Sequence, residues 1–144
     1  MKITPAWKDA EGKGLKDIGW ALEYDGSISF DEAIKIEIGS KCLKVSGSLT
    51  SKLHINASGS IEAGGGIKAG GGIEAGFQIR CRKTLAFRFN LFAGTAVWKK
   101  TTEDDQLVEC AELKGGEIKH GILRIISPEG KTEHPGRNSK EDGI

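Results

Sequence analysis

The segment 59–76 reads Gly-Ser-Ile-Glu-Ala-Gly-Gly-Gly-Ile-Lys-Ala-Gly-Gly-Gly-Ile-Glu-Ala-Gly, with isoleucine at every sixth position. An aliphatic residue keeps this spacing over a longer run, at Leu43, Leu49, Ile55, Ile61, Ile67, Ile73, Ile79, Leu85, Leu91 and Val97. We call these residues the anchors. The residue two positions after each anchor is mostly small, as at Ala63 and Ala75. A repeat this short and regular predicts a β-solenoid, in which short strands wind round a thin apolar core.

The charges directly after the anchors indicate how many repeats form one turn of the solenoid. With two repeats per coil, Glu62 would stack on Glu74, placing like charges at a strand spacing of about 4.8 Å. With three repeats per coil, Lys44, Glu62 and Arg80 form one column of alternating charge. The sequence therefore predicts an all-β, three-sided β-helix (β-solenoid) of about three coils, each made of three six-residue repeats.

The segments outside the anchors are expected to cover the ends of the helix. Alternating apolar residues in 27–38 predict a strand pair that caps the first coil, and the change of register that follows points to a bend at Gly39 and Ser40. Segments 107–113 and 117–126, on either side of a Lys-Gly-Gly turn, predict a C-terminal β-hairpin. The expected single domain has an N-terminal cap (1–42), a hexapeptide-repeat β-helix (43–98), a hairpin cap (99–126) and a flexible tail (127–144).

Composition limits the general affinities of the chain. Lys and Arg number 21 against 20 Asp and Glu, so any attraction to nucleic acid or anionic lipid must be local. No apolar run approaches the roughly 20 residues of a membrane span, and the N-terminal residues lack the apolar core of a signal peptide. Cys42, Cys81 and Cys110 are odd in number and far apart, which is typical of free thiols in a reducing compartment. We expect a cytoplasmic protein with no membrane contact.

Candidates for catalysis or metal binding are few. His54, His120 and His134 are isolated, and no Cys/His spacing matches a zinc site. The glycines at 64–66 and 70–72 follow the repeat and precede no Gly-Lys-Ser/Thr, unlike a phosphate-binding loop. We expect no enzyme activity, no catalytic residue, no metal and no cofactor.

Two surfaces are candidates for binding. The segment 77–100 carries basic and aromatic residues and no acidic one, and the predicted partner-binding residues are Arg80, Arg82, Arg88, Phe92, Trp98, Lys99 and Lys100. With three repeats per coil, Arg82 would stack on Lys100, a like-charge pair that favours an acidic partner or a direct contact with nucleic acid. In the alternative, acidic residues of 103–112 fold back over this patch as a cap.

The second surface is poor in side chains. Gly64, Gly66, Gly70 and Gly72 would leave a flat backbone that suits another protein or a second copy of the chain, giving a homo-oligomer. Equally, these residues could be glycine because the corners of the coil need a positive φ angle.

The run 59–76, together with Leu91-Phe92-Ala93-Gly94, resembles uncharacterised bacterial and phage proteins built on Gly-x-Ile-x-Ala-Gly repeats. More distantly it is similar to bactofilins, and the resemblance covers about residues 43–97. Similarity to bactofilins implies a β-helix that polymerises end to end. Similarity to small mobile-element proteins implies a stoichiometric inhibitor of a host defence system, of the anti-CRISPR type.

A third resemblance is to the hexapeptide acyltransferases, which are three-sided β-helices with the same aliphatic spacing. They favour a small residue four positions after the anchor, whereas this chain has it two positions after, and His54 is the sole candidate base. We therefore expect a non-enzymatic β-helix protein that binds and blocks a protein or nucleoprotein. The alternatives are a self-assembling, bactofilin-like scaffold and, third, an acyltransferase.

Overall fold

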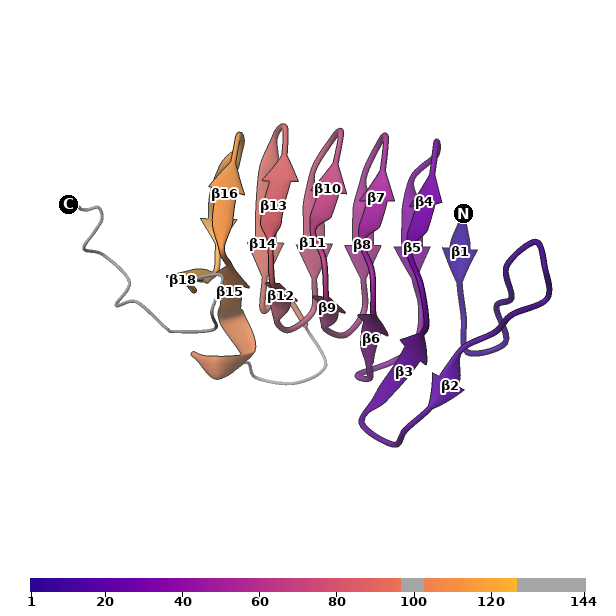
Figure 1. Cartoon of the computed structure of the whole chain (residues 1–144). Helices are drawn as coiled ribbons and strands as arrows, with labels where there is room; N and C mark the ends of the chain where they lie inside the picture. The colour runs from indigo at the N-terminus through magenta and orange to yellow at the C-terminus, as the bar shows by residue number, and fades with distance from the viewer. Residues whose placement is uncertain (97–102, 127–144) are drawn as a thin grey trace.

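The computed structural model describes residues 1–96 and 103–126, which form a β-solenoid (Figure 1). Within these residues the chain winds through five successive coils of three strands. The coils are β3 (Ala21–Tyr24), β4 (Ile28–Phe30), β5 (Ile34–Ile36); β6 (Cys42–Val45), β7 (Leu49–Ser51), β8 (Ile55–Ala57); β9 (Ile61–Ala63), β10 (Ile67–Ala69), β11 (Ile73–Ala75); β12 (Ile79–Cys81), β13 (Thr84–Phe87), β14 (Asn90–Ala93); and β15 (Leu107–Cys110), β16 (Glu112–Lys114), β17 (Glu117–His120). Outside them lie β1 (Lys2–Ile3), β2 (Lys16–Asp17), the 3-10 helix η1 (Asp104–Gln106) and β18 (Ile122–Ile125).

The strands of successive coils stack into three sheets, one for each side of the solenoid (Figure 1). The six-stranded sheet has the order β1-β5-β8-β11-β14-β17, the five-stranded sheet β16-β13-β10-β7-β4, and the seven-stranded sheet β18-β15-β12-β9-β6-β3-β2. All of these neighbours are parallel except β2 and β3. With β1 and β18 added to the five coils, the stack has about six turns.

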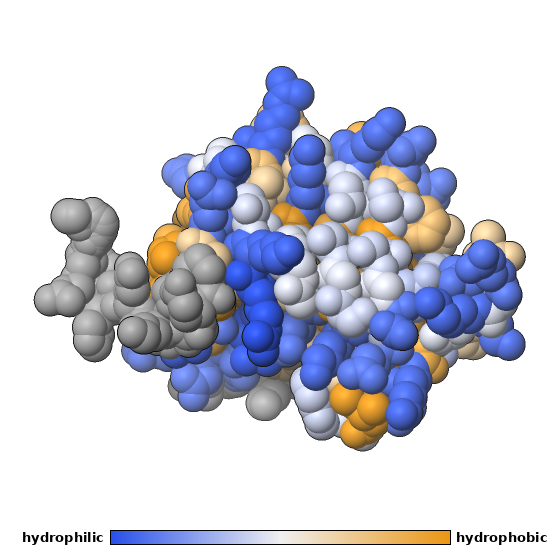
Figure 2. Space-filling model, in the orientation of Figure 1, coloured by the Kyte–Doolittle hydropathy of each residue, from blue (hydrophilic) through white to orange (hydrophobic). Residues whose placement is uncertain are grey.

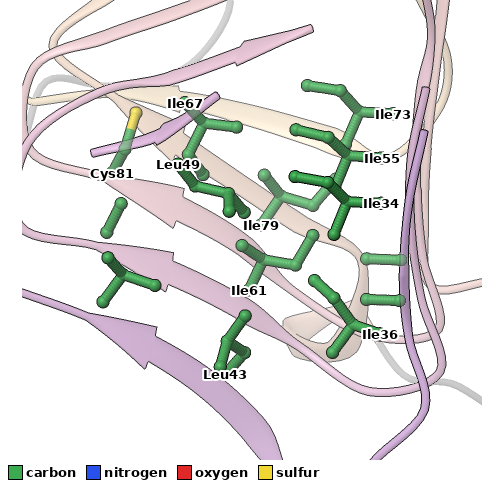
Figure 3. Close-up of a cluster of buried hydrophobic side chains, with 14 of the residues drawn as sticks. Ile34, Ile36, Leu43, Leu49, Ile55, Ile61, Ile67, Ile73, Ile79 and Cys81 are labelled. Carbon is green, nitrogen blue, oxygen red and sulfur yellow. The ribbon is translucent and has the colours of Figure 1, made fainter. Parts of the chain in front are cut away.

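The predicted three-sided coil is confirmed in the regular part of the chain. Leu43 pairs with Ile61, which pairs with Ile79, so each partner lies three repeats further along the sequence. The side chains of the anchors form columns inside the solenoid, one of which contains Ile55 and Ile73 (Figure 3). Each anchor from Leu43 to Leu91 is at most 1% exposed, and the residue two positions after it is buried too, so each strand contributes one large and one mostly small side chain to the core.

The N-terminal flank differs from the expected strand pair. β4 and β5 do not pair with each other, because β4 pairs with β7 and β5 with β8, in different sheets. They belong to a complete coil that is three residues longer than a regular one, since Ile28 pairs with Leu49. The extra residues lie at the predicted bend, where Gly39 has a φ of 67°.

The predicted C-terminal hairpin is wrong. β16 pairs with β13 and β17 with β14, so these strands continue the solenoid instead of pairing with each other. Gly115 and Gly116, both with positive φ, turn the chain round a corner between two sheets. The coil count therefore exceeds the expected three. The tail 127–144 lies outside the described residues.

A lengthened coil precedes β15. Ile79 pairs with Val108, whereas a regular coil would place Val97 beside it. The predicted stacking of Arg82 on Lys100 assumed a regular coil. In the structure, Arg82 is followed by Lys83, whose carbonyl accepts hydrogen bonds from the N–H groups of Ala111 and Glu112 in the next coil.

Trp7 covers the N-terminal end of the core. Its ring lies 5.5 Å from that of Tyr24 and 6.4 Å from that of Phe30, between ring centroids. Trp20, in contrast, is 56% exposed, and the amine of Lys44 lies over its ring. In the described part of the chain, no helix is long and apolar enough to cross a membrane.

Candidate binding surface

The outward residues of the seven-stranded sheet form a ladder of alternating charge. We call this set the charge ladder; its members are Glu23, Lys44, Glu62, Arg80, Glu109 and Arg124. The predicted alternation of Lys44, Glu62 and Arg80 is thus present and extends by one coil toward the N-terminus and two toward the C-terminus. Arg80 forms an ion pair with Glu62, and Arg124 forms one with Glu109.

The ladder changes the interpretation of Arg80. This residue was predicted to bind a partner, yet its guanidinium is occupied by Glu62 and its neighbour in the next coil is Glu109. Alternating charges on adjacent strands stabilise a sheet by about 0.2 to 1 kcal/mol per pair. Arg80 therefore has a sufficient role within the fold.

The five-stranded sheet carries a basic surface of a different kind. Its outward positions are Ser29, Thr50, Lys68, Ala86 and Lys114, mostly small or uncharged residues that leave a flat face. Arg82 and Lys83 stand at the corner before β13, and Arg88 stands at the corner after it. We call Lys68, Arg82, Lys83 and Arg88 the basic face.

The four cations of the basic face are all exposed. Within residues 1–96 and 103–126, none of them forms an ion pair, whereas Lys52 pairs with Asp31 and Lys114 with Glu112. The guanidinium carbon of Arg88 lies 5.5 Å from the centre of the Phe89 ring, and this cation–π contact leaves the guanidinium open to solvent. Because none of these four cations is paired with an acidic side chain in the described residues, the fold does not require a positive charge at their positions.

Two acidic residues after position 103 bind groups outside the basic face. Glu109 lies in the charge ladder with Arg124, and Glu112 accepts a hydrogen bond from Thr84 Oγ1 at 3.1 Å. Asp104 offers its backbone carbonyl to the side-chain amide of Gln78 at 2.6 Å. The alternative of an acidic cap over the whole predicted patch stays a prediction, because Lys99 and Lys100 of that patch lie outside the described residues.

The glycines predicted to mediate self-association are explained by the stacking of coils. A Cβ atom on Gly66 would lie 2.7 Å from the carbonyl oxygen of Thr84, and one on Gly72 would lie 2.7 Å from that of Asn90. Gly64 and Gly70 face backbone carbonyls of the preceding coil in the same way. None of the four has a positive φ, so the alternative based on φ is wrong: glycine is required by close approach of backbones.

A groove of about 470 Å³ lies beside the basic face, on the six-stranded sheet. Phe89 (54% exposed) and Phe92 (37% exposed) line it, together with Asn56, Glu74 and His54. His54 Nδ1 accepts the N–H of Gly72 at 2.9 Å, and the Asn56 amide donates to Glu74 at 3.3 Å. Phe92 thus points outward as predicted, next to a corner that also carries Arg88.

For two residues of this surface, the position expected from the repeat pattern differs from the position in the structure. Inward and outward alternation along a six-residue repeat would place a third inward residue four positions after each anchor, as at Lys83 and Phe89, but that position is the corner between sheets. Both side chains reach solvent from their corners. A signal was available, since glycine and lysine at this position suit a corner better than a core. Trp98, Lys99 and Lys100 lie outside the described residues.

The thiols able to perform covalent chemistry are buried. Desolvation by burial raises the pKa of the Cys42 and Cys110 thiols to about 12 and that of Cys81 to about 11, so these thiols stay protonated near neutral pH. In the part of the chain that the structure describes, no three His, Cys, Asp or Glu residues lie together as a metal site would require.

Comparison of the chain with protein-family models, with curated proteins and with solved structures found no significant match. The face seen in Figure 2 shows hydrophilic side chains around a pale central area. Such a rigid support holds its exposed side chains at fixed positions.

Proposed function

We propose that this β-solenoid is a non-enzymatic binding protein that uses the basic face to hold an acidic surface of a protein or nucleoprotein. One observation supports this most directly: Lys68, Arg82, Lys83 and Arg88 are exposed without an ion-pair partner in the described residues, while the charges of the neighbouring sheet are matched in a ladder. The corner that holds Arg88 and Phe89 adds an apolar contact beside the charge, which would favour a protein surface over bare phosphate.

Blocking of a host defence system, expected from the resemblance to mobile-element proteins, is one form that such binding could take. It remains a prediction about the identity of the partner. The acyltransferase alternative gains no support, because His54 accepts a hydrogen bond from a backbone N–H and bonds to no acidic side chain in the described part of the chain.

The proposal predicts that charge reversal on the basic face removes binding. In the variant Arg82→Glu/Lys83→Glu/Arg88→Glu, we expect affinity capture of the partner from a bacterial lysate to be lost, because three attractive contacts become repulsive. Arg80 is left unchanged, since its substitution would disturb the charge ladder. Circular dichroism and the urea midpoint should match the wild-type protein.

The control of equal net charge is Lys2→Glu/Lys8→Glu/Lys16→Glu, at the other end of the stack; because it removes the exposed ion pair of Lys2 with Glu37 and places a carboxylate opposite Glu23, its urea midpoint is measured alongside. This variant should capture the same partner as the wild type. Titration of labelled duplex DNA at several salt concentrations separates the two partner classes, since direct phosphate contacts give a steep salt dependence. Equal capture by wild type and the basic-face variant would exclude the proposal.

A further inference from the structure

The two ends of the solenoid are finished differently. At the N-terminal end, Trp7, Leu15 and Phe30 pack against the core, and β1 and β2 extend two of the three sheets. Edge strands are found at both ends, since among the described residues β1, β2 and β4 at one end and β16, β17 and β18 at the other each pair on one side only. The difference is that no described aromatic residue packs over the core at the C-terminal end. An end of this kind exposes unpaired backbone groups together with core side chains.

The exposed C-terminal end is apolar at its centre. Leu113, Ile118 and Leu123 occupy the anchor positions of β16, β17 and β18, and each is only partly buried. Ile122 beside them is 37% exposed.

The charges of the edge strands complement themselves when two copies meet. β16 reads Glu112-Leu113-Lys114 and β17 begins Glu117-Ile118-Lys119, with a shift in register after Ile118 that makes Lys119 the extra residue; each strand thus has an acid before its anchor and a base after it. When such a strand pairs with an antiparallel copy of itself, the anchors face each other and each acid faces a base. Parallel pairing would place acid on acid.

We infer that the C-terminal end binds a second copy of the chain, forming a closed dimer with a two-fold axis through β17. A two-fold axis across the end of a three-sided coil pairs one strand with itself and exchanges the other two. With the axis through β17, Ile118 meets Ile118 of the second copy, and β16 meets β18. The chain rises by a third of a coil from each strand to the next, so β16, β17 and β18 end at three different heights. Only an axis through β17, the middle one of the three, makes the gap between paired strands of the two copies equal at all three places where strands meet.

The charges agree with this setting. Glu117 of each copy lies beside Lys119 of the other, and Glu112 lies beside Arg124 when Leu113 is opposite Leu123. The covered N-terminal end prevents further growth, so the product is a dimer rather than a filament. The inference does not depend on the basic face, whose residues belong to the coils before the last one.

The dimer is tested on the full chain by sedimentation equilibrium from micromolar to millimolar concentration. We expect a mass approaching twice the 15.4 kDa of one chain. Glu117→Lys should weaken association by about tenfold, since two opposite-charge contacts become like-charge contacts. The double variant Glu117→Lys/Lys119→Glu restores complementarity and should restore the dimer. A single-chain mass throughout, masses that keep rising, or failure of this rescue would overturn the inference.

A crosslink tests the position of the axis. Ile118→Cys places one thiol opposite its own copy, so mild oxidation should give a covalent dimer. Thr50→Cys, in the middle of the five-stranded sheet, is the matched control and should stay uncrosslinked, as should the wild type with its buried thiols. Equal crosslinking at positions 50 and 118 would contradict the two-fold contact. Circular dichroism of each variant verifies the fold.

Discussion

Gly66 shows at the scale of one residue what the stacking of coils demands. Its place after the corner brings it so close to the carbonyl oxygen of Thr84 that a Cβ atom would lie 2.7 Å away. Gly66→Ala should therefore lower the free energy of unfolding by about 1 to 3 kcal/mol, because the backbone of the next coil has to move. Urea unfolding followed by circular dichroism measures this change.

Gly14→Ala is the control for that substitution. Gly14 has an ordinary φ, and the atoms nearest to its missing Cβ lie 3.4 Å away, at normal van der Waals distance. Its stability should be unchanged or raised by about 0.5 kcal/mol, since alanine restricts the unfolded chain. An equal loss in both variants would show that the close approach at Gly66 does not set the cost.

Single residues also show where the sequence was sufficient. The anchors from Leu43 to Leu91 were predicted correctly, because the six-residue spacing of these aliphatic side chains alone indicates which of them are buried; Val97 lies outside the described residues. Phe89 was misplaced because the corner position accepts glycine, lysine or phenylalanine, and hydrophobicity alone does not separate core from corner there. Arg80 and Arg82 are two positions apart in sequence, yet one is held in the ladder and the other is exposed without an ion pair to the described residues, a difference that depends on neighbours in other coils.

At the scale of elements, a strand of three residues carries too little information to choose its partner. β16 and β17 have the alternation and the glycine turn of a hairpin, so the local pattern predicted one. The structure pairs them with β13 and β14, because a parallel partner was already available at the end of the stack. The sequence predicted the strands, and the edge supplied by the previous coil determined the pairing.

The charge ladder leads to a prediction at this scale. Arg80→Glu places three carboxylates on adjacent strands of the seven-stranded sheet, so the free energy of unfolding should fall by about 1 to 2 kcal/mol. Lys68→Glu is the matched control, because its neighbours Thr50 and Ala86 are uncharged; it should change stability by less than about 0.5 kcal/mol.

Salt distinguishes charge from packing in this comparison. Because the side chain at position 80 is partly exposed, added sodium chloride should recover part of the loss in Arg80→Glu and leave Lys68→Glu unchanged. Urea midpoints at low and high salt provide the measurement. If the two variants lost the same stability at low salt, alternation in the ladder would not contribute.

At the scale of the whole molecule, the length of the solenoid was underestimated for one reason. The flanks break the spacing of the anchors, with three extra residues near Gly39 and a lengthened coil before β15, but they keep the inward and outward alternation. A corner accepts insertions, since extra residues loop outward without disturbing the strands. A strict period therefore identifies the centre of a solenoid and misses its ends.

The N-terminal cover is held by one aromatic residue and a short loop. Trp7 packs on Tyr24, whose hydroxyl donates to Asp9 at 2.7 Å, and the same carboxylate accepts the backbone N–H groups of Glu11 and Lys13. These hydrogen bonds, led by that from Tyr24, keep the pKa of Asp9 below its usual value, so the loop stays fastened at neutral pH. The loop positions Trp7 over the open end of the core.

Removal of this cover should affect both stability and assembly. Trp7→Ala exposes the rings of Tyr24 and Phe30, and we expect the free energy of unfolding to fall by about 2 to 4 kcal/mol, measured by circular dichroism in urea. Trp20→Ala removes an indole of the same size that is 56% exposed, so the free energy of unfolding should fall by less than about 1 kcal/mol.

Trp7→Ala would also leave two open ends on each chain. Its mass in sedimentation should then rise beyond that of a dimer as the concentration increases, whereas Trp20→Ala should behave as the wild type. Similar losses in the two variants would mean that the N-terminal end needs no cover, and the difference between the ends would then no longer explain why assembly stops at two chains.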